Sequence, residues 1–197
     1  MVINLETAVE FLKTRDNFLI LTHSHPDGDT LGSAFALKYA LEAVGKRANV
    51  KCNDTVAKKF DYLGKVCEDE CAFDALVAVD VADTKLLGKD FEEKFADRID
   101  LCIDHHGSNR MFAERTLLDA NAAAACEIVL EVIHALGIKP TKQIADCIYT
   151  GISTDTGCFR YSNVTPRTMR MAAEMIECGA DNVTINTVMF ETKTRTY

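Results

Sequence analysis

The sequence predicts an α/β fold, with a parallel β-sheet of about five strands and helices on both faces. Short apolar runs of strand length alternate with longer segments of helical period, which is typical of a parallel sheet joined by helical crossovers. Three of the apolar runs end directly in polar side chains, at Thr22-His23, Val79-Asp80 and Ile103-Asp104. Because parallel strands share one carboxyl edge, we expect these side chains to converge in one crevice.

The strands of this sheet are predicted from five apolar runs, over residues 18–22, 48–51, 75–79, 99–103 and 115–118. The runs at 18–22 and 75–79 are apolar at almost every position, as expected for strands buried on both faces. Residues 55–64 are expected to form a helical or irregular crossover between the second and third strands.

Helical periodicity predicts helices over residues 5–15, 29–44, 91–95, 122–136, 141–152, 165–179 and 182–190. Several of their ends carry the usual signals. Gly45 and Gly137 follow the last apolar residues of two helices, whereas Thr141 and Thr165-Pro166 are typical first residues of two others.

Composition excludes several classes of protein. The formal net charge of −8 argues against an extended surface for nucleic acid, although it allows a small anionic substrate held by metal ions. No apolar run approaches the roughly 20 residues of a membrane span, and residues 1–10 lack the basic segment of a signal peptide. The eight cysteines are scattered, so we interpret them as reduced thiols of a cytoplasmic protein.

The polar residues at the predicted crevice have the chemistry of a metal centre. They comprise five carboxylates and three imidazoles: Asp27, Asp29, Asp80, Asp104, Asp155, His23, His105 and His106. Carboxylates gathered in this way repel one another, and divalent cations remove that repulsion. Mixed imidazole and carboxylate ligands suit manganese, iron or zinc better than calcium. Asp80 stands between the other motifs in the sequence and is the natural carboxylate to bridge two ions.

Four motifs occur in order: His23-Ser24-His25-Pro26-Asp27-Gly28-Asp29, Val79-Asp80-Val81-Ala82-Asp83, Asp104-His105-His106 and Gly151-Ile152-Ser153-Thr154-Asp155. With these motifs the sequence resembles the DHH phosphoesterase family over nearly its whole length. The resemblance implies a catalytic domain over residues 1–190 and the start of a linker over 191–197. The family's second domain carries a Gly-Gly-Gly-His signature that this chain lacks.

The resemblance also implies a metal site with two manganese ions. It implies that His23, Asp27 and Asp155 hold one ion, that Asp29 and His105 hold the other, and that Asp80 bridges them. The implied catalytic residues are Asp80, Asp104 and His106. Of these, Asp104 either orients His105 or completes the site of the second ion.

The resemblance further implies the residues that contact substrate. His106 contacts the phosphate and is a candidate acid for the leaving oxygen, while Asn109 and Arg160 are candidate substrate contacts. His25 stands where the family commonly has asparagine, and two roles for it stay open. It is either a substrate contact or a group that supports the metal ligands from outside.

The function implied by the resemblance is a manganese-dependent phosphoesterase that hydrolyses short oligonucleotides (nanoRNA) or 3′-phosphoadenosine 5′-phosphate (pAp) through an activated water. A cyclic-dinucleotide phosphodiesterase or an inorganic pyrophosphatase is the alternative enzyme. A third hypothesis, prompted by the missing second domain, is a metal- or nucleotide-binding module without turnover. The expected partner is a small nucleotide or short oligonucleotide, and a homodimer is compatible with the sequence.

Overall fold

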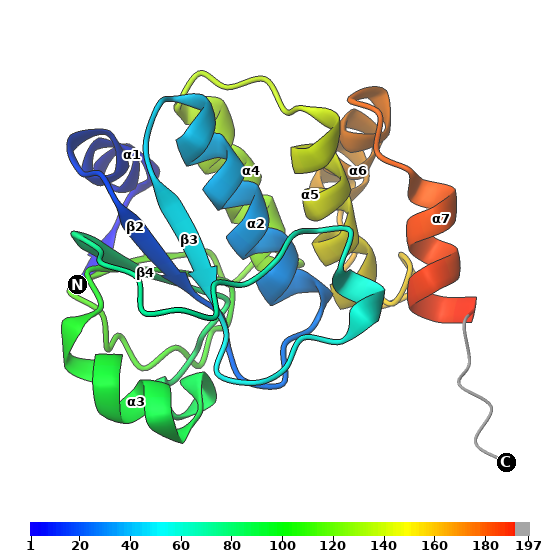
Figure 1. Ribbon diagram of the computed structural model, residues 1–197. Helices are drawn as coiled ribbons and strands as arrows, with labels where there is room; N and C mark the ends of the chain where they lie inside the picture. The colour runs from blue at the N-terminus through cyan, green and yellow to red at the C-terminus, as the bar shows by residue number, and fades with distance from the viewer. Residues whose placement is uncertain (192–197) are drawn as a thin grey trace, which may run out of the picture.

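The computed structural model describes residues 1–191, and its centre is a six-stranded parallel sheet with the strand order β1-β6-β5-β4-β2-β3 (Figure 1). The strands are β1 (Val2–Ile3), β2 (Phe18–Leu21), β3 (Ala48–Lys51), β4 (Ala75–Val79), β5 (Leu101–Asp104) and β6 (Arg115–Leu118). The predicted fold class is confirmed, with six strands in place of about five. The additional strand, β1, has only two residues, which is too short for an alternating pattern to reveal.

The helices are α1 (Leu5–Thr14), α2 (Gly28–Ala43), α3 (Lys89–Phe95), α4 (Ala125–Ala135), α5 (Lys142–Asp155), α6 (Pro166–Glu177) and α7 (Asn182–Asn186). Short 3-10 turns occur at Lys58–Phe60, Thr84–Leu87 and Ala96–Arg98, and a π-helical turn covers Thr187–Glu191. The Thr141 and Thr165 hydroxyls accept hydrogen bonds from first-turn amides of α5 and α6, as predicted. Helix α5 continues three residues past its predicted end and thereby carries Asp155.

The two faces of the sheet are covered unequally. Helices α1, α2 and α4 pack on one face, and α5, α6 and α7 form a further layer outside α2 and α4 (Figure 1). Helix α3 and neighbouring aromatic residues cover the opposite face with a smaller apolar cluster. Alternation along β4 serves both layers, since Val77 and Val79 face the larger cluster while Leu76 and Ala78 face the smaller one.

The order of the strands creates a switch point between β2 and β4. From β2 the chain moves outward to β3, then returns to the other side of β2 and continues through β4, β5 and β6. Open α/β sheets bind ligands at such a point, beyond the carboxyl ends of the strands. His23 and Asp80 follow the two strands that flank it.

Three smaller expectations can be compared with the structure. Cys67 and Cys71 form a disulfide in an irregular stretch before β4, so the prediction that all eight cysteines are free thiols is wrong for this pair. No helix or strand lies between Cys67 and Cys71, so the irregular chain can turn back and bring the two sulfur atoms together.

None of the helices within residues 1–191 is both long and apolar enough to cross a membrane. The predicted linker at 191–197 lies outside the described residues except for Glu191.

Candidate metal centre

The loop between β2 and α2 supplies His23 and Asp27. Asp27 is the N-cap of α2, and its Oδ1 accepts hydrogen bonds from the amides of Asp29 (2.9 Å) and Thr30 (3.1 Å). The Thr30 hydroxyl accepts from the His23 amide (3.3 Å) and donates to the carbonyl of Val79 (3.2 Å). Thr30 therefore joins the ends of β2 and β4, a role that the sequence analysis did not identify.

Asp29 lies fully buried in the first turn of α2 and caps another helix. Its carboxylate accepts from the amides of Ala125 (2.6 Å) and Cys126 (2.9 Å), the first residues of α4. The N-cap residue of α4 is Ala124, which has no side-chain acceptor, so Asp29 supplies the negative group that this helix end favours. Burial, together with the nearby Asp80 and Asp155 carboxylates, raises the pKa of Asp29 well above its usual range.

Asp80 directly follows β4 and has a left-handed backbone, with φ at 57°. In a continued strand, alternation would direct the Asp80 side chain to the α3 face, opposite to Val79. The left-handed turn instead allows its carboxylate to reach His23, His105 and His106 at 3.5–3.6 Å. Such backbone strain is common at functional sites. Asp80 Oδ1 is buried and has no hydrogen-bond partner among the described residues.

His23 and His105 have the same orientation. The Nδ1–H of His23 donates to the carbonyl of Ser24 (2.7 Å), and that of His105 donates to the carbonyl of Ala122 (3.2 Å). Each ring therefore directs Nε2 toward the carboxylates, an arrangement typical of metal-binding histidines. Burial lowers both pKa values, but the carboxylates outweigh it and raise the pKa of His23 to about 11 and that of His105 to about 10.

Asp104 organises the loop after β5. Its Oδ1 accepts from His106 Nδ1 (2.8 Å) and from the His105 amide (2.9 Å), and its Oδ2 accepts from Asn109 Nδ2 (2.7 Å). The hydrogen bond that His106 donates to Asp104 raises the pKa of His106. Asp104 thus fixes the ring of His106, whereas the resemblance had implied His105 as its target or a direct place in the second metal site.

Asp155 reaches the centre from the last turn of α5. Its Oδ2 lies 3.3 Å from His105 Nε2. Burial, followed by the repulsion of Asp80, raises the pKa of Asp155 to about 6. Potential metal-ligand atoms of Asp155, Asp29 and His105 lie within 4.8 Å of one another, and neither His23 nor Asp27 belongs to this group.

Glycines allow α2 and α5 to approach closely enough for Asp29 and Asp155 to meet. A Cβ on Gly32 would overlap the carbonyl oxygen of Cys147, and a Cβ on Gly151 would overlap Cys126 Sγ and lie 2.7 Å from Asp29 Oδ1. The sequence does contain a signal for this packing, because Gly28 and Gly32 are four residues apart and lie on one face of α2.

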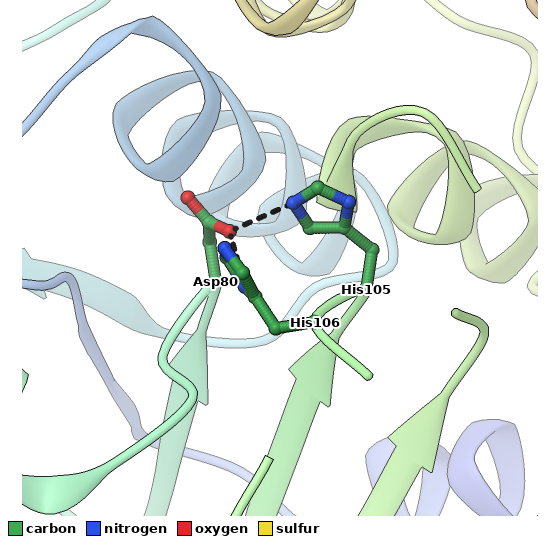
Figure 2. Close-up of side chains that lie close together, drawn as sticks. All are labelled: Asp80, His105 and His106. Atoms are coloured by element: carbon green, nitrogen blue, oxygen red, sulfur yellow. Dashed lines mark ion pairs between the residues drawn. The ribbon is translucent and has the colours of Figure 1, made fainter. Parts of the chain in front are cut away.

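The donor atoms form three overlapping groups, each within 4.8 Å: Asp80, His105 and His106; His23, Asp27 and Asp80; Asp29, His105 and Asp155. Two ligands that are each about 2.1 Å from one ion lie roughly 3–3.5 Å apart. The separations of 3.3–3.8 Å between imidazole nitrogens and carboxylate oxygens fit that spacing better than direct hydrogen bonds. Figure 2 shows the carboxylate of Asp80 paired with the rings of both His105 and His106. These residues fit divalent cations, and Asp80 Oδ1, which accepts no hydrogen bond from residues 1–191, supplies a ready ligand.

Of the candidate substrate contacts, His106 belongs to the first of these groups, whereas His25, Asn109 and Arg160 lie outside all three. His25 is exposed, and its amide and Nδ1 both lie 3.0 Å from Asp54 Oδ2. Its φ of 55° explains why asparagine or histidine suits this position, since both tolerate the left-handed region. Asn109 is buried and bonded to Val81, Asp104 and Met111. Arg160 is exposed and donates from Nε to the carbonyl of Gly157 (2.6 Å).

Comparisons with known proteins agree with this geometry. A family model described as "DHH family, N-terminal domain" matches residues 17–152. The bifunctional oligoribonuclease and PAP phosphatase NrnA of Thermus thermophilus is 37% identical over 81% of this chain and 49% of its own length.

Two solved structures share the fold. An exopolyphosphatase-related protein from Bacteroides fragilis superposes with a TM-score of 0.87 at 22% identity, over 97% of this chain and 61% of its own. Exonuclease RecJ bound to manganese superposes with a TM-score of 0.57 at 16% identity, over 88% of this chain and 47% of its own. The chain spans about half the length of the curated relatives it matches.

Proposed function

The chain belongs to the DHH family, and on this premise we propose that residues 1–190 form the catalytic domain of a phosphoesterase that uses two manganese ions. One observation carries the proposal. The carboxylate of Asp80 belongs to two of the three donor groups and has a buried oxygen that accepts no hydrogen bond from residues 1–191, as suits a bridging ligand. Manganese is the proposed ion because the ligands mix imidazole with carboxylate and because the RecJ structure was determined with it.

We assign His23, Asp27 and Asp80 to one ion, and Asp29, His105 and Asp155, together with Asp80, to the other. This assignment moves Asp155 to the second ion. The reason is its distance of 3.3 Å from His105 and its shared donor group with Asp29. A pair of divalent cations held in this way lowers the pKa of a water molecule and neutralises charge at the phosphorus.

His106 is the proposed proton donor to the leaving oxygen. Its Nδ1 is held by Asp104, so Nε2 is the nitrogen available to a substrate. The raised pKa of His106 keeps the imidazole protonated to a higher pH than usual, which suits both a phosphate contact and an acid. Asn109 is a proposed positioning residue. Its side-chain amide donates to Asp104 and to the carbonyl of Val81 and accepts from the amide of Met111.

The proposed substrates are short oligoribonucleotides and pAp, because the Thermus thermophilus relative is named as an oligoribonuclease and PAP phosphatase. The proposed location is the cytoplasm. Arg160 is the exposed cation of the loop after Asp155, and we retain it as a proposed phosphate contact. His25 is engaged with Asp54 and is proposed to support the metal-binding loop.

The test begins with calorimetric titration of metal-stripped protein with Mn²⁺. We expect two ions in the wild type and disruption of the pair in Asp80→Asn, with loss of Mn²⁺-dependent hydrolysis of pApA and pAp. Asp83→Asn is the matched control, because this carboxylate lies three residues later, pairs with Arg110 and belongs to none of the donor groups. Undiminished binding by Asp80→Asn would refute the assignment, whereas two bound ions without turnover of any phosphoester would favour the binding-module hypothesis.

A further inference from the structure

A hollow of about 360 Å³ adjoins the proposed metal centre and is chemically unlike it. Asp27 and Asp155 line one side of the hollow. Lys59, Phe60, Met189 and Phe190 line the other, so that the hollow has a metal-binding wall and an apolar, aromatic wall with a single cation. Its volume lies within the roughly 300–1,000 Å³ of small-molecule pockets, which are typically apolar with few polar groups.

The apolar wall is built from two segments that are far apart in the sequence. Lys59 and Phe60 belong to the 3-10 turn after β3, and Met189 and Phe190 belong to the π-helical turn after α7. Figure 1 shows the turn at Lys58–Phe60 beside α7. Since neither segment has a sequence motif, the sequence alone did not indicate this wall.

Three of the four side chains of the wall are available to a ligand. Met189 and Phe190 are only half-buried, whereas Phe60 is almost fully buried. Lys59 is exposed and has no ion pair with any residue of 1–191, and its Nζ lies 4.8 Å from the centre of the Phe60 ring. An unpaired cation beside an aromatic surface suits a flat, neutral ring attached to a negatively charged phosphate.

We propose that this hollow binds the nucleoside attached to the reacting phosphate, with the base against Phe190 and Met189 and with Lys59 near a phosphate or base carbonyl. The inference rests on the proposed function, because the metal centre fixes where the phosphate lies. The inference also favours nucleotides over inorganic phosphates as the substrate class. A nucleotide would contact both walls of the hollow, whereas pyrophosphate or polyphosphate would leave the apolar wall without a contact.

The test measures the contribution of the base to binding. Calorimetric titrations of Mn²⁺-loaded protein compare AMP with ribose 5-phosphate, which has the same phosphate and sugar without the base. We expect AMP to bind about 5- to 150-fold more tightly, the range of one base stacked on one aromatic side chain. Phe190→Ala should remove this preference and leave the affinity for ribose 5-phosphate unchanged. Lys59→Ala should weaken the binding of GMP, whose base has a carbonyl oxygen, more than the binding of AMP.

Two matched controls separate the hollow from general effects. Phe73→Ala removes a half-buried ring from the opposite face of the sheet, and Lys58→Ala removes the exposed lysine next to Lys59, outside the hollow. Both should keep the wild-type preference for AMP. Equal binding of AMP and ribose 5-phosphate by the wild type, a preference that survives Phe190→Ala, or no AMP binding at all would overturn the inference.

Failure of the proposed function has a different signature. If the protein prefers AMP over ribose 5-phosphate through Phe190 but does not hydrolyse pApA or pAp with Mn²⁺, the hollow stands and the catalytic proposal fails. If it hydrolyses pApA and an abasic analogue with equal KM, and Phe190→Ala changes neither, catalysis stands and the hollow is not the nucleoside site.

Discussion

Gly151→Ala tests the idea that close contact between α2, α4 and α5 assembles the metal ligands. A Cβ at this position would overlap Cys126 Sγ and lie 2.7 Å from Asp29 Oδ1 and 2.9 Å from Cys126 Cβ. Asp29 cannot move aside without leaving its hydrogen bonds to the amides of Ala125 and Cys126. The substitution should therefore push α5, with Asp155, away from Asp29.

The size of the effect follows from opposing contributions. Alanine in place of glycine stabilises a helix interior by about 1 kcal/mol. Overpacking costs about 1–3 kcal/mol, and weakening the buried hydrogen bonds of Asp29 costs about 1–3 kcal/mol more. We expect a net loss of about 1–5 kcal/mol, which corresponds to a Tm lower by roughly 2–20 °C for a chain of this size.

The assay is urea unfolding of metal-stripped protein, in which Gly151→Ala should lower the midpoint without changing the slope. Cys126→Ala provides the matched rescue, because it removes the sulfur that the new methyl group would overlap. The double variant should be more stable than the sum of the single effects by about 1 kcal/mol. An unchanged or higher midpoint for Gly151→Ala, or strict additivity with Cys126→Ala, would refute the packing argument.

Three further predictions concern titration and backbone conformation. Asp104→Asn removes the carboxylate that raises the pKa of His106, so the alkaline limb of the kcat–pH profile should move to lower pH; an unmoved limb would exclude His106 as the proton donor. The pKa of Asp155 is raised from 3.8 to about 6, so in metal-free protein its contribution to stability is complete below pH 3.8 and is lost as the pH rises through 6. Mn²⁺ binds the ionised carboxylate, so the stabilisation of the fold by Mn²⁺ should be small at pH 5 and complete above pH 7. Its full size is about 2.7 kcal/mol for one site at a hundredfold excess over Kd. An increase in Tm that does not depend on pH would contradict this expectation. His25→Val should lower the free energy of unfolding by about 1–2 kcal/mol because of the positive φ, whereas His25→Asn should not, and equal stability of the two variants in urea would count against the strain argument.

Local pattern was enough to predict the fold class and the edge of the sheet at which polar side chains gather. Apolar runs that end in His23, Asp80 and Asp104 identify strand ends, and parallel strands bring their carboxyl ends to one edge. The caps at Thr141 and Thr165 were also predicted, because a cap depends on residues within one helical turn. The two-residue β1 was missed since its pairing with β6 leaves no periodic trace.

Tertiary structure alone decided how the polar side chains group around the proposed ions and which residues surround them. Asp29 caps a helix that begins 96 residues later, and glycines let α5, which carries Asp155, lie close to α2, which carries Asp29. The hollow lined by Lys59 and Phe190 likewise joins segments with no shared motif. Sequence periodicity records which face of an element is buried, whereas contacts between distant elements depend on how side-chain volumes fit when those faces meet.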